Sequence, residues 1–204
     1  MKKEDKIEKI NIITLGNATV GKTCFILRYT ENFFQPVYLS TNSIDSQNKQ
    51  ITLPNSKTYN IVLYDTCGQE RFKSISFNFI KNADGVLLMY DITNKESFEE
   101  INNWMKSIIE LKRINFPVVL IGNKSDLEEK REVTKEEGEN LAQLYGMSFF
   151  ETTNVHGTNV EEACTELINK IIENEEYKNK ITGKKEKKKI SLDKSNNNSK
   201  TGCC

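Results

Sequence analysis

The sequence predicts an α/β domain in which helices cover both faces of a mostly parallel sheet. Continuous apolar runs, typical of strands buried on both faces, alternate with stretches of helical periodicity. Three helix starts carry a Ser/Thr-x-x-Glu pattern, which is typical of a capped first turn. A chain of 204 residues is long enough for one such domain with a well-buried core.

Each expected element rests on its own stretch of sequence. The strands are the apolar runs at residues 10–15, 49–53, 59–65, 85–92, 117–122 and 148–151. Helical periodicity covers residues 22–32, 97–113, 134–145 and 160–175. The capping pairs are Thr93 with Glu96, Thr134 with Glu137, and Thr158 with Glu161.

Two stretches, residues 33–48 and 66–82, break this alternation of strand and helix. In sheets of this type, ligands bind at the carboxyl ends of the strands. We therefore expect the function to lie in these two stretches and in the loops that follow strands.

Charge is distributed unevenly along the chain. Overall, 29 Lys and Arg balance 29 Asp and Glu, but residues 178–200 hold nine lysines and only two acidic residues. This segment therefore carries +7 and the remainder −7. Because this segment also has almost no apolar residues, we expect a disordered Lys/Asn-rich tail at 178–204. The folded domain would then cover residues 9–177, after an N-terminal extension at 1–8.

Composition argues against several classes of protein. No run of 18 apolar residues is present to cross a membrane, and the charged start has no apolar signal-peptide core behind it. The five cysteines lack Cys-x-x-Cys spacing and the chain has one histidine, which argues against a zinc site. We expect a cytosolic protein with reduced thiols.

Residues 16–23, GNATVGKT, fit the spacing G-x-x-x-x-G-K-S/T of a phosphate-binding loop. An apolar strand leads into the loop and a helix leads out, which is the context that the motif needs. Gly16 and Gly21 allow backbone N–H groups to approach a polyphosphate at the positive end of the helix. Lys22 then suits the β- and γ-phosphates, and Thr23 suits Mg²⁺. The alternative is an ordinary turn that contains glycine.

Three further loops follow expected strands. Asp65 could hold Mg²⁺ through a water, and Gly68 could bring an N–H to a γ-phosphate, although both residues are also common in plain turns. In the segment Asn123-Lys124-Ser125-Asp126, the last carboxylate can accept paired hydrogen bonds from guanine N1–H and N2–H₂, which adenine does not offer. Its alternative is a polar turn. Residues 151–154 follow the last strand, where a backbone N–H could reach guanine O6.

In this order, the motifs resemble those of the Ras-like small GTPases, and their amino-acid sequences are most similar to those of the Rab family. The similar motifs are residues 65–72 (DTCGQERF), 88–93 (LMYDIT), 123–127 (NKSDL) and the terminal Cys203-Cys204. The resemblance covers roughly residues 8–176 and the end of the tail. It implies a P-loop GTPase domain with a six-stranded sheet that includes one antiparallel strand. It also implies a Mg²⁺·GTP site and two nucleotide-sensitive switch segments, which coincide with the two stretches that break the alternation.

The resemblance further implies a role for each matching residue. Gln69 would orient the attacking water and, with Lys22 and Thr41, make up the catalytic set. The metal residues would be Thr23, Thr41 and, in the outer shell, Asp65. The residues that bind the nucleotide would be Thr19, Val20, Gly21, Lys22, Thr23, Cys24, Phe34, Thr41, Gly68, Asn123, Lys124, Asp126, Thr153, Asn154 and Val155.

Three departures from the family pattern bear on function. Residues 42–46 read NSIDS where the family usually reads Ile-Gly-x-Asp-Phe, so a glycine and two apolar effector contacts are missing. Residues 64–67 read YDTC for Trp-Asp-Thr-Ala, and residues 153–155 read TNV for Ser-Ala-Lys.

Two functions therefore stay open. One is a switch that hydrolyses GTP slowly and recruits effectors in membrane trafficking; the other is a GTP-binding membrane adaptor with weak or no hydrolysis. Gln69 favours the switch. The Asn-Lys-x-Asp segment argues against a third reading, a P-loop ATPase or nucleotide kinase.

The terminal Cys203-Cys204 looks like the Rab signal for attachment of two geranylgeranyl groups. Two lipid chains beside a basic segment anchor a protein stably, and the lysines suit anionic lipid better than nucleic acid because no aromatic residues are interleaved with them. We expect a monomer on the cytoplasmic face of an intracellular membrane that cycles with the cytosol. Its expected partners are a guanine nucleotide exchange factor, a GTPase-activating protein, effectors and a prenyl-binding escort.

Overall fold

The structure, a computed structural model, describes residues 7–34, 44–54, 56–66, 73–112 and 116–182. Six strands form one sheet in the order β2-β3-β1-β4-β5-β6. They are β1 (Glu8–Leu15), β2 (Asp45–Thr52), β3 (Thr58–Asp65), β4 (Gly85–Asp91), β5 (Val118–Asn123) and β6 (Ser148–Thr152). The β2–β3 pair is antiparallel and the other four pairs are parallel, which confirms the predicted fold class.

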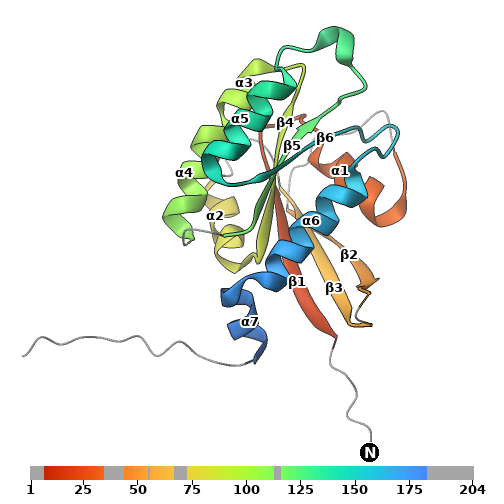
Figure 1. Ribbon diagram of the computed structural model, residues 1–204, viewed down its shortest axis with the longest axis vertical. Coiled ribbons are helices and arrows are strands. Elements are labelled where there is room, and N and C mark those ends of the chain that lie inside the picture. The colour runs from red at the N-terminus through yellow and green to blue at the C-terminus, as the bar shows by residue number, and fades with distance from the viewer. Residues whose placement is uncertain (1–6, 35–43, 55, 67–72, 113–115, 183–204) are drawn as a thin grey trace, which may run out of the picture.

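Helices cover both faces of the sheet (Figure 1). On one face lie α1 (Lys22–Glu31) and α6 (Val160–Glu173). On the other lie α2 (Lys73–Asn82), α4 (Ile101–Leu111) and α5 (Lys135–Tyr145). The remaining described helices are short: α3 (Lys95–Glu99), α7 (Glu175–Thr182) and a 3₁₀ turn at Glu128–Lys130.

Strand residues point alternately into two cores. Along β1, Ile10 and Ile12 enter the core under α1 and α6, whereas Ile13 and Leu15 enter the core on the opposite face. All four are fully buried. Because each such side chain contributes roughly 1.5–3 kcal/mol on burial, the apolar runs read from the sequence hold the sheet between its helices.

Strand β2 is longer than its apolar residues predicted. It begins at Asp45, not residue 49, although its first residues are polar and exposed. It pairs with β3 along its whole length, from Asp45 opposite Asp65 to Thr52 opposite Thr58. Backbone pairing to a buried neighbour therefore outweighs the weak strand preference of the sequence.

The predicted helix at 97–113 is two helices, α3 and α4, which meet at Glu100. The Glu100 backbone is still helical (φ −65°, ψ −16°), so the break is slight. The predicted cap at Thr93 is wrong. Asn94 caps α3 instead, because its side chain accepts a hydrogen bond from the backbone N–H of Ser97 at 2.8 Å.

The two later capping predictions have opposite outcomes. Thr134 and Glu137 form the predicted reciprocal capping box at the start of α5. The cap predicted at Thr158 is wrong, because α6 begins after Asn159, whose backbone is left-handed (φ 59°) and whose side chain does not cap the helix. The Asn159 amide donates instead to the Glu151 carbonyl at 2.7 Å.

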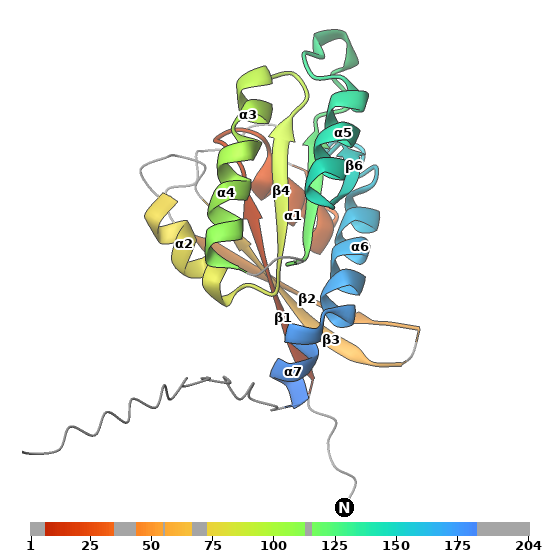
Figure 2. The same ribbon diagram turned by 60° about the vertical axis from the view of Figure 1, so that its left-hand side comes forward.

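The folded part of the chain extends beyond the predicted boundary at residue 177. Helix α7 lies beside the start of β1 (Figure 2), with Tyr177 only 4% exposed. Lys180 forms an ion pair with Asp84 at 2.7 Å. The expectation of disorder is therefore wrong for residues 178–182, while residues 183–204 lie outside the described residues.

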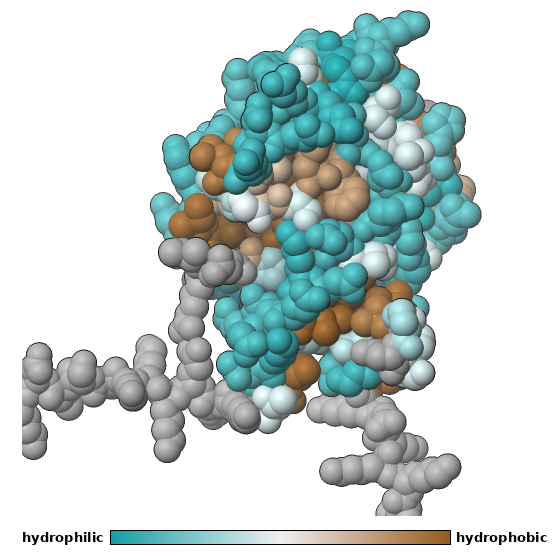
Figure 3. Space-filling model, viewed as in Figure 1, coloured by the Kyte–Doolittle hydropathy of each residue, from teal (hydrophilic) through white to brown (hydrophobic). Residues whose placement is uncertain are grey.

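Most of the surface in Figure 3 is hydrophilic, and its apolar side chains form separate patches. Ile109 on α4 and Leu144 on α5 are 50% and 73% exposed. Among the described helices, none has both the length and the apolar character that crossing a bilayer requires.

Candidate functional site

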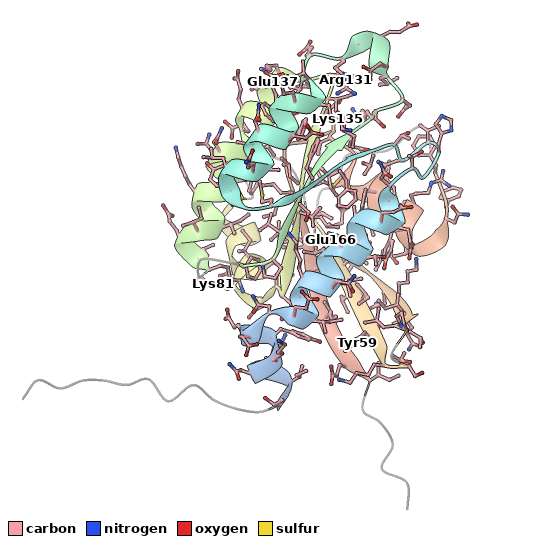
Figure 4. The ribbon with its side chains drawn as sticks, viewed as in Figure 1. Tyr59, Lys81, Arg131, Lys135, Glu137 and Glu166 are labelled. Carbon is pink, nitrogen blue, oxygen red and sulfur yellow. The ribbon has the colours of Figure 1, made fainter. Side chains whose placement is uncertain are left out.

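The predicted motifs converge at one edge of the sheet. Strands β1, β4, β5 and β6 are parallel, so the loops that follow them meet at their carboxyl ends. Figure 4 shows Arg131, in the segment after the Asn123–Asp126 turn, far from Tyr59 near the start of β3. The candidate site therefore lies at the end of the domain opposite to the start of β1.

The phosphate-binding loop has the conformation that its glycines permit. Gly16 (φ 141°) and Gly21 (φ 99°) lie in backbone regions that favour glycine, and Thr19 is left-handed (φ 64°). A Cβ on Gly16 would lie 2.1 Å from the Met89 carbonyl oxygen, so only glycine lets the loop lie against β4.

The side chain of Lys22 folds back over this loop. Its ammonium donates hydrogen bonds to the carbonyls of Gly16 at 3.0 Å and Asn17 at 2.7 Å, and the residue is 5% exposed. Trp104 of α4 is 3% exposed, and its indole N–H donates to the Asn17 side chain at 3.3 Å. Lys22, at the end of the loop, and Trp104, from α4, therefore both hold the loop in place.

A hydroxyl and a carboxylate meet beside the loop. The Thr23 hydroxyl donates to Asp65 Oδ2 at 2.5 Å, although 42 residues separate the two. Asp65 is 4% exposed at the end of β3. Oxygen ligands of this kind suit Mg²⁺, so the pair fits the predicted metal position. Burial and then the Asp65 carboxylate raise the pKa of the adjacent Cys24 thiol, which therefore stays protonated.

Asn123 joins the end of β5 to the phosphate-binding loop. Its amide donates to the Val20 carbonyl at 2.8 Å, and its Oδ1 accepts from the Thr152 hydroxyl at 3.0 Å. The side chain is fully buried. Asn123 therefore connects the ends of β5 and β6 to the phosphate-binding loop.

The turn after Asn123 presents a carboxylate to solvent. Lys124 is left-handed (φ 67°), and its ammonium pairs with Asp91 Oδ2 at 2.5 Å. The backbone N–H of Ser125 donates to the Thr152 carbonyl at 3.0 Å. Asp126 is exposed and forms no hydrogen bond or ion pair with the described residues. Its carboxylate can therefore accept the paired donors of a guanine base.

The loop after β6 is fixed by a residue of α1. Thr153 and Asn154 are each 5% exposed, and Val155 is 40% exposed. Arg28 donates to the Asn154 carbonyl from Nε at 2.8 Å and to the Val155 carbonyl from Nη2 at 2.9 Å. The same guanidinium lies 6.0 Å from the ring centroid of Phe34.

The structure thus brings together the predicted residues of the phosphate-binding loop, of the turn at 123–126 (the base turn) and of the loop after β6. Thr41, Gly68 and Gln69, and the terminal Cys203 and Cys204, lie outside the described residues.

Sequence reasoning missed three supporting residues: Arg28, Asp91 and Thr152. Asp91 had a signal, because a carboxylate ends the fully buried strand β4. Arg28 had none. Thr152 lies in the segment 151–154 that was selected from the sequence, but its hydroxyl contact with Asn123 could not be predicted, because it joins residues far apart in the sequence.

Comparison with known proteins agrees with this geometry. The family model described as "Ras family" matches residues 11–173. The chain is 42% identical over 161 residues to Ras-related protein Rab-13 of Canis lupus familiaris, covering 79% of both chains. It is 40% identical to human Ras-related protein Rab-8B, covering 79% of this chain and 77% of the relative. It is 39% identical over 173 residues to human Ras-related protein Rab-27B, covering 80% and 79%.

Proposed function

Because the chain belongs to the Ras family of small GTPases, in its Rab branch, and is a GTPase, we propose that it is a Rab-type switch that recruits effectors in intracellular membrane trafficking. The observation that best supports this proposal is the convergence of four separate motifs at one edge of the sheet. Asn123 joins the base turn to the phosphate loop, and Thr23 joins that loop to Asp65.

We assign the roles in the site as follows. Backbone N–H groups of the phosphate loop and the Lys22 ammonium bind the phosphates, while Thr23 and Asp65 lie where Mg²⁺ is held. When bound, Mg²⁺ neutralises charge on the β- and γ-phosphates. Asp126 selects guanine, Asn123 and Lys124 position the base turn, and Phe34 stacks on the edge of the base.

Hydrolysis depends on residues of the two switch segments. Gln69 orients the attacking water, while Thr41 and Gly68 each sense the γ-phosphate. No arginine occurs in residues 16–23 or 33–48. Slow intrinsic turnover follows, and an arginine from an activating protein should add about 10³- to 10⁵-fold, as it does for Ras.

We further propose that the protein is anchored through Cys203 and Cys204 on the cytoplasmic face of an intracellular membrane. An exchange factor, an activating protein and a prenyl-binding escort would drive its cycle. Ordinary Rab effectors should recognise it poorly, because residues 42–46 lack the usual apolar contacts.

The decisive experiment is single-turnover GTP hydrolysis by the full chain, with and without a GTPase-activating protein. The wild type should hydrolyse GTP slowly alone and faster with the activator. Gln69→Leu should still bind GTP but lose the stimulated rate. Absence of stimulated hydrolysis in the wild type, together with tight GTP binding, would support the adaptor function instead.

A further inference from the structure

Asn154 makes a contact that the Rab pattern does not provide, because that pattern has alanine at this position. Its side chain is buried, and its amide donates to the carbonyl of Gly21 at 3.0 Å. Asn123 donates in the same way to the carbonyl of Val20 at 2.8 Å. Two asparagines, from the loops after β5 and β6, therefore hold consecutive carbonyls of the phosphate loop.

These contacts fix the orientation of two N–H groups. The peptide bond is planar, so the Val20 carbonyl sets the direction of the Gly21 N–H, and the Gly21 carbonyl sets that of the Lys22 N–H. Both N–H groups belong to the proposed phosphate cradle. The Gly21 carbonyl also accepts the first hydrogen bond of α1, from Phe25 at 2.9 Å. Asn154 thus acts at the junction of the loop and its helix.

Both amides occupy the space that a side chain at position 21 would need. A Cβ on Gly21 would lie 2.4 Å from the Asn123 amide nitrogen and 2.9 Å from that of Asn154. The backbone of Asn154 is held in turn, because Arg28 donates to its carbonyl at 2.8 Å. The first amide is held through its own oxygen, which accepts from Thr152, whereas the second is held through its backbone.

Stability alone does not account for asparagine here. Asn154 Oδ1 is buried and has no hydrogen-bond partner among the described residues. A buried acceptor without a partner is unfavourable, and alanine would avoid it. Exchanging the amide nitrogen and oxygen of Asn154 would place its oxygen against the Gly21 carbonyl oxygen, which is repulsive. The Asn154 amide therefore acts as a donor to this carbonyl.

We propose that Asn154 is a positioning residue that orients the phosphate loop and slows the release of guanine nucleotide. The inference rests on the proposed guanine-nucleotide function. Asn154 links the loop that follows β6 to the phosphate loop. Loss of its donor therefore weakens binding of the phosphates by the loop N–H groups, without altering how Asp126 reads the base.

The test uses the full chain loaded with mant-GDP and Mg²⁺, with release measured after addition of excess unlabelled GDP. Asn154→Ala should release mant-GDP roughly 3- to 10-fold faster, the effect of one hydrogen bond. Asn154→Asp keeps the shape but replaces the donor by an acceptor, so its release should be faster still. His156→Ala is the control, because His156 is exposed in the same loop.

A role in packing alone predicts that Asn154→Asp behaves like the wild type, and this result would overturn the proposal. Asn154→Ala should also accelerate the release of mant-GDP and of mant-IDP by the same factor. Inosine lacks the amino group that Asp126 reads, but Asn154 contacts the phosphate loop and not the base. A wild type that fails to retain GDP would overturn the proposed function as well. A wild type that retains GDP, with Asn154→Ala releasing it at the same rate, would remove only this inference.

Discussion

Asp126 is the predicted base-reading carboxylate, and it is exposed at the site. Asp126→Asn should weaken GTP binding by about 100-fold or more, because an amide donates where the carboxylate accepted two hydrogen bonds. The variant should instead bind xanthosine triphosphate, whose base presents an oxygen in place of the amino group. Competition titration against a fluorescent guanine nucleotide measures both effects.

A suitable control is Glu129→Gln, which removes an exposed acid three residues further along the chain. It should leave the preference for GTP unchanged. Equal affinity of the wild type for ATP and GTP, or an Asp126→Asn variant that still prefers GTP, would contradict the assigned role.

At the scale of residues, the sequence predicts the residues that would contact a ligand better than the residues that hold them in place. Asn123, Lys124 and Asp126 were found because their chemistry lies within four consecutive residues. Arg28 was missed because its role depends on the carbonyls of Asn154 and Val155, which are more than 120 residues away in sequence. The side-chain contact of Asn154 was also missed, because only a backbone contact was expected there.

At the scale of elements, the start of α5 has a measurable pH dependence. Glu137 pairs with Lys95 and accepts the backbone N–H of Thr134 at 2.8 Å. The hydrogen bond from Lys95, followed by that from Thr134, lowers the pKa of Glu137 to about 2. Since this pKa lies below the unfolded value near 4.5, the stabilisation is present above pH 4.5 and is lost as the pH falls toward 2.

Urea unfolding between pH 7 and pH 3 tests this prediction. Glu137→Gln should be less stable than the wild type at pH 7, and the difference should shrink at pH 3. The control Glu136→Gln alters an exposed neighbour in the same turn. A difference between Glu137→Gln and the wild type that stays constant across this range would show that the charge of Glu137 does not stabilise the helix.

The predicted elements also show where local pattern is insufficient. The capping box at α5 is contained in four residues, and it was predicted correctly. Helix α2 was missed because its helical pattern is weak, while Ile80 packs fully buried in the core. Helix α7 was missed for a related reason: its polar sequence is held by one buried tyrosine, Tyr177, and by the ion pair of Lys180 with Asp84. Long-range contacts decide such elements.

At the scale of the whole molecule, α7 and the nucleotide site lie at opposite ends. Tyr177 packs beside Lys9 at the start of β1, whereas the phosphate loop follows the end of the same strand. The described chain therefore leaves the domain at the end opposite to the site, and the proposed anchor residues Cys203 and Cys204 follow α7 in the sequence.

This arrangement leads to a prediction about membrane attachment. Wild type expressed in eukaryotic cells should partition to membranes, because two prenyl chains beside a basic segment anchor stably, whereas one chain binds only marginally. The double variant Cys203→Ser/Cys204→Ser should become cytosolic while still binding GTP. Either single variant should be intermediate. Fractionation followed by immunoblotting measures the distribution.

Two controls separate lipid from charge. Cys164→Ser removes a buried cysteine elsewhere in the domain and should remain in the membrane pellet. Replacing the lysines at 184, 185, 187, 188 and 189 by glutamine should weaken attachment to anionic lipid, by about 1 kcal/mol for each lysine near the surface. That loss should disappear in high salt, because screening already removes the attraction in the wild type. If the double cysteine variant stayed in the pellet after a salt wash, neither prenylation nor charge could be the anchor, and a protein partner would have to hold the domain at the membrane.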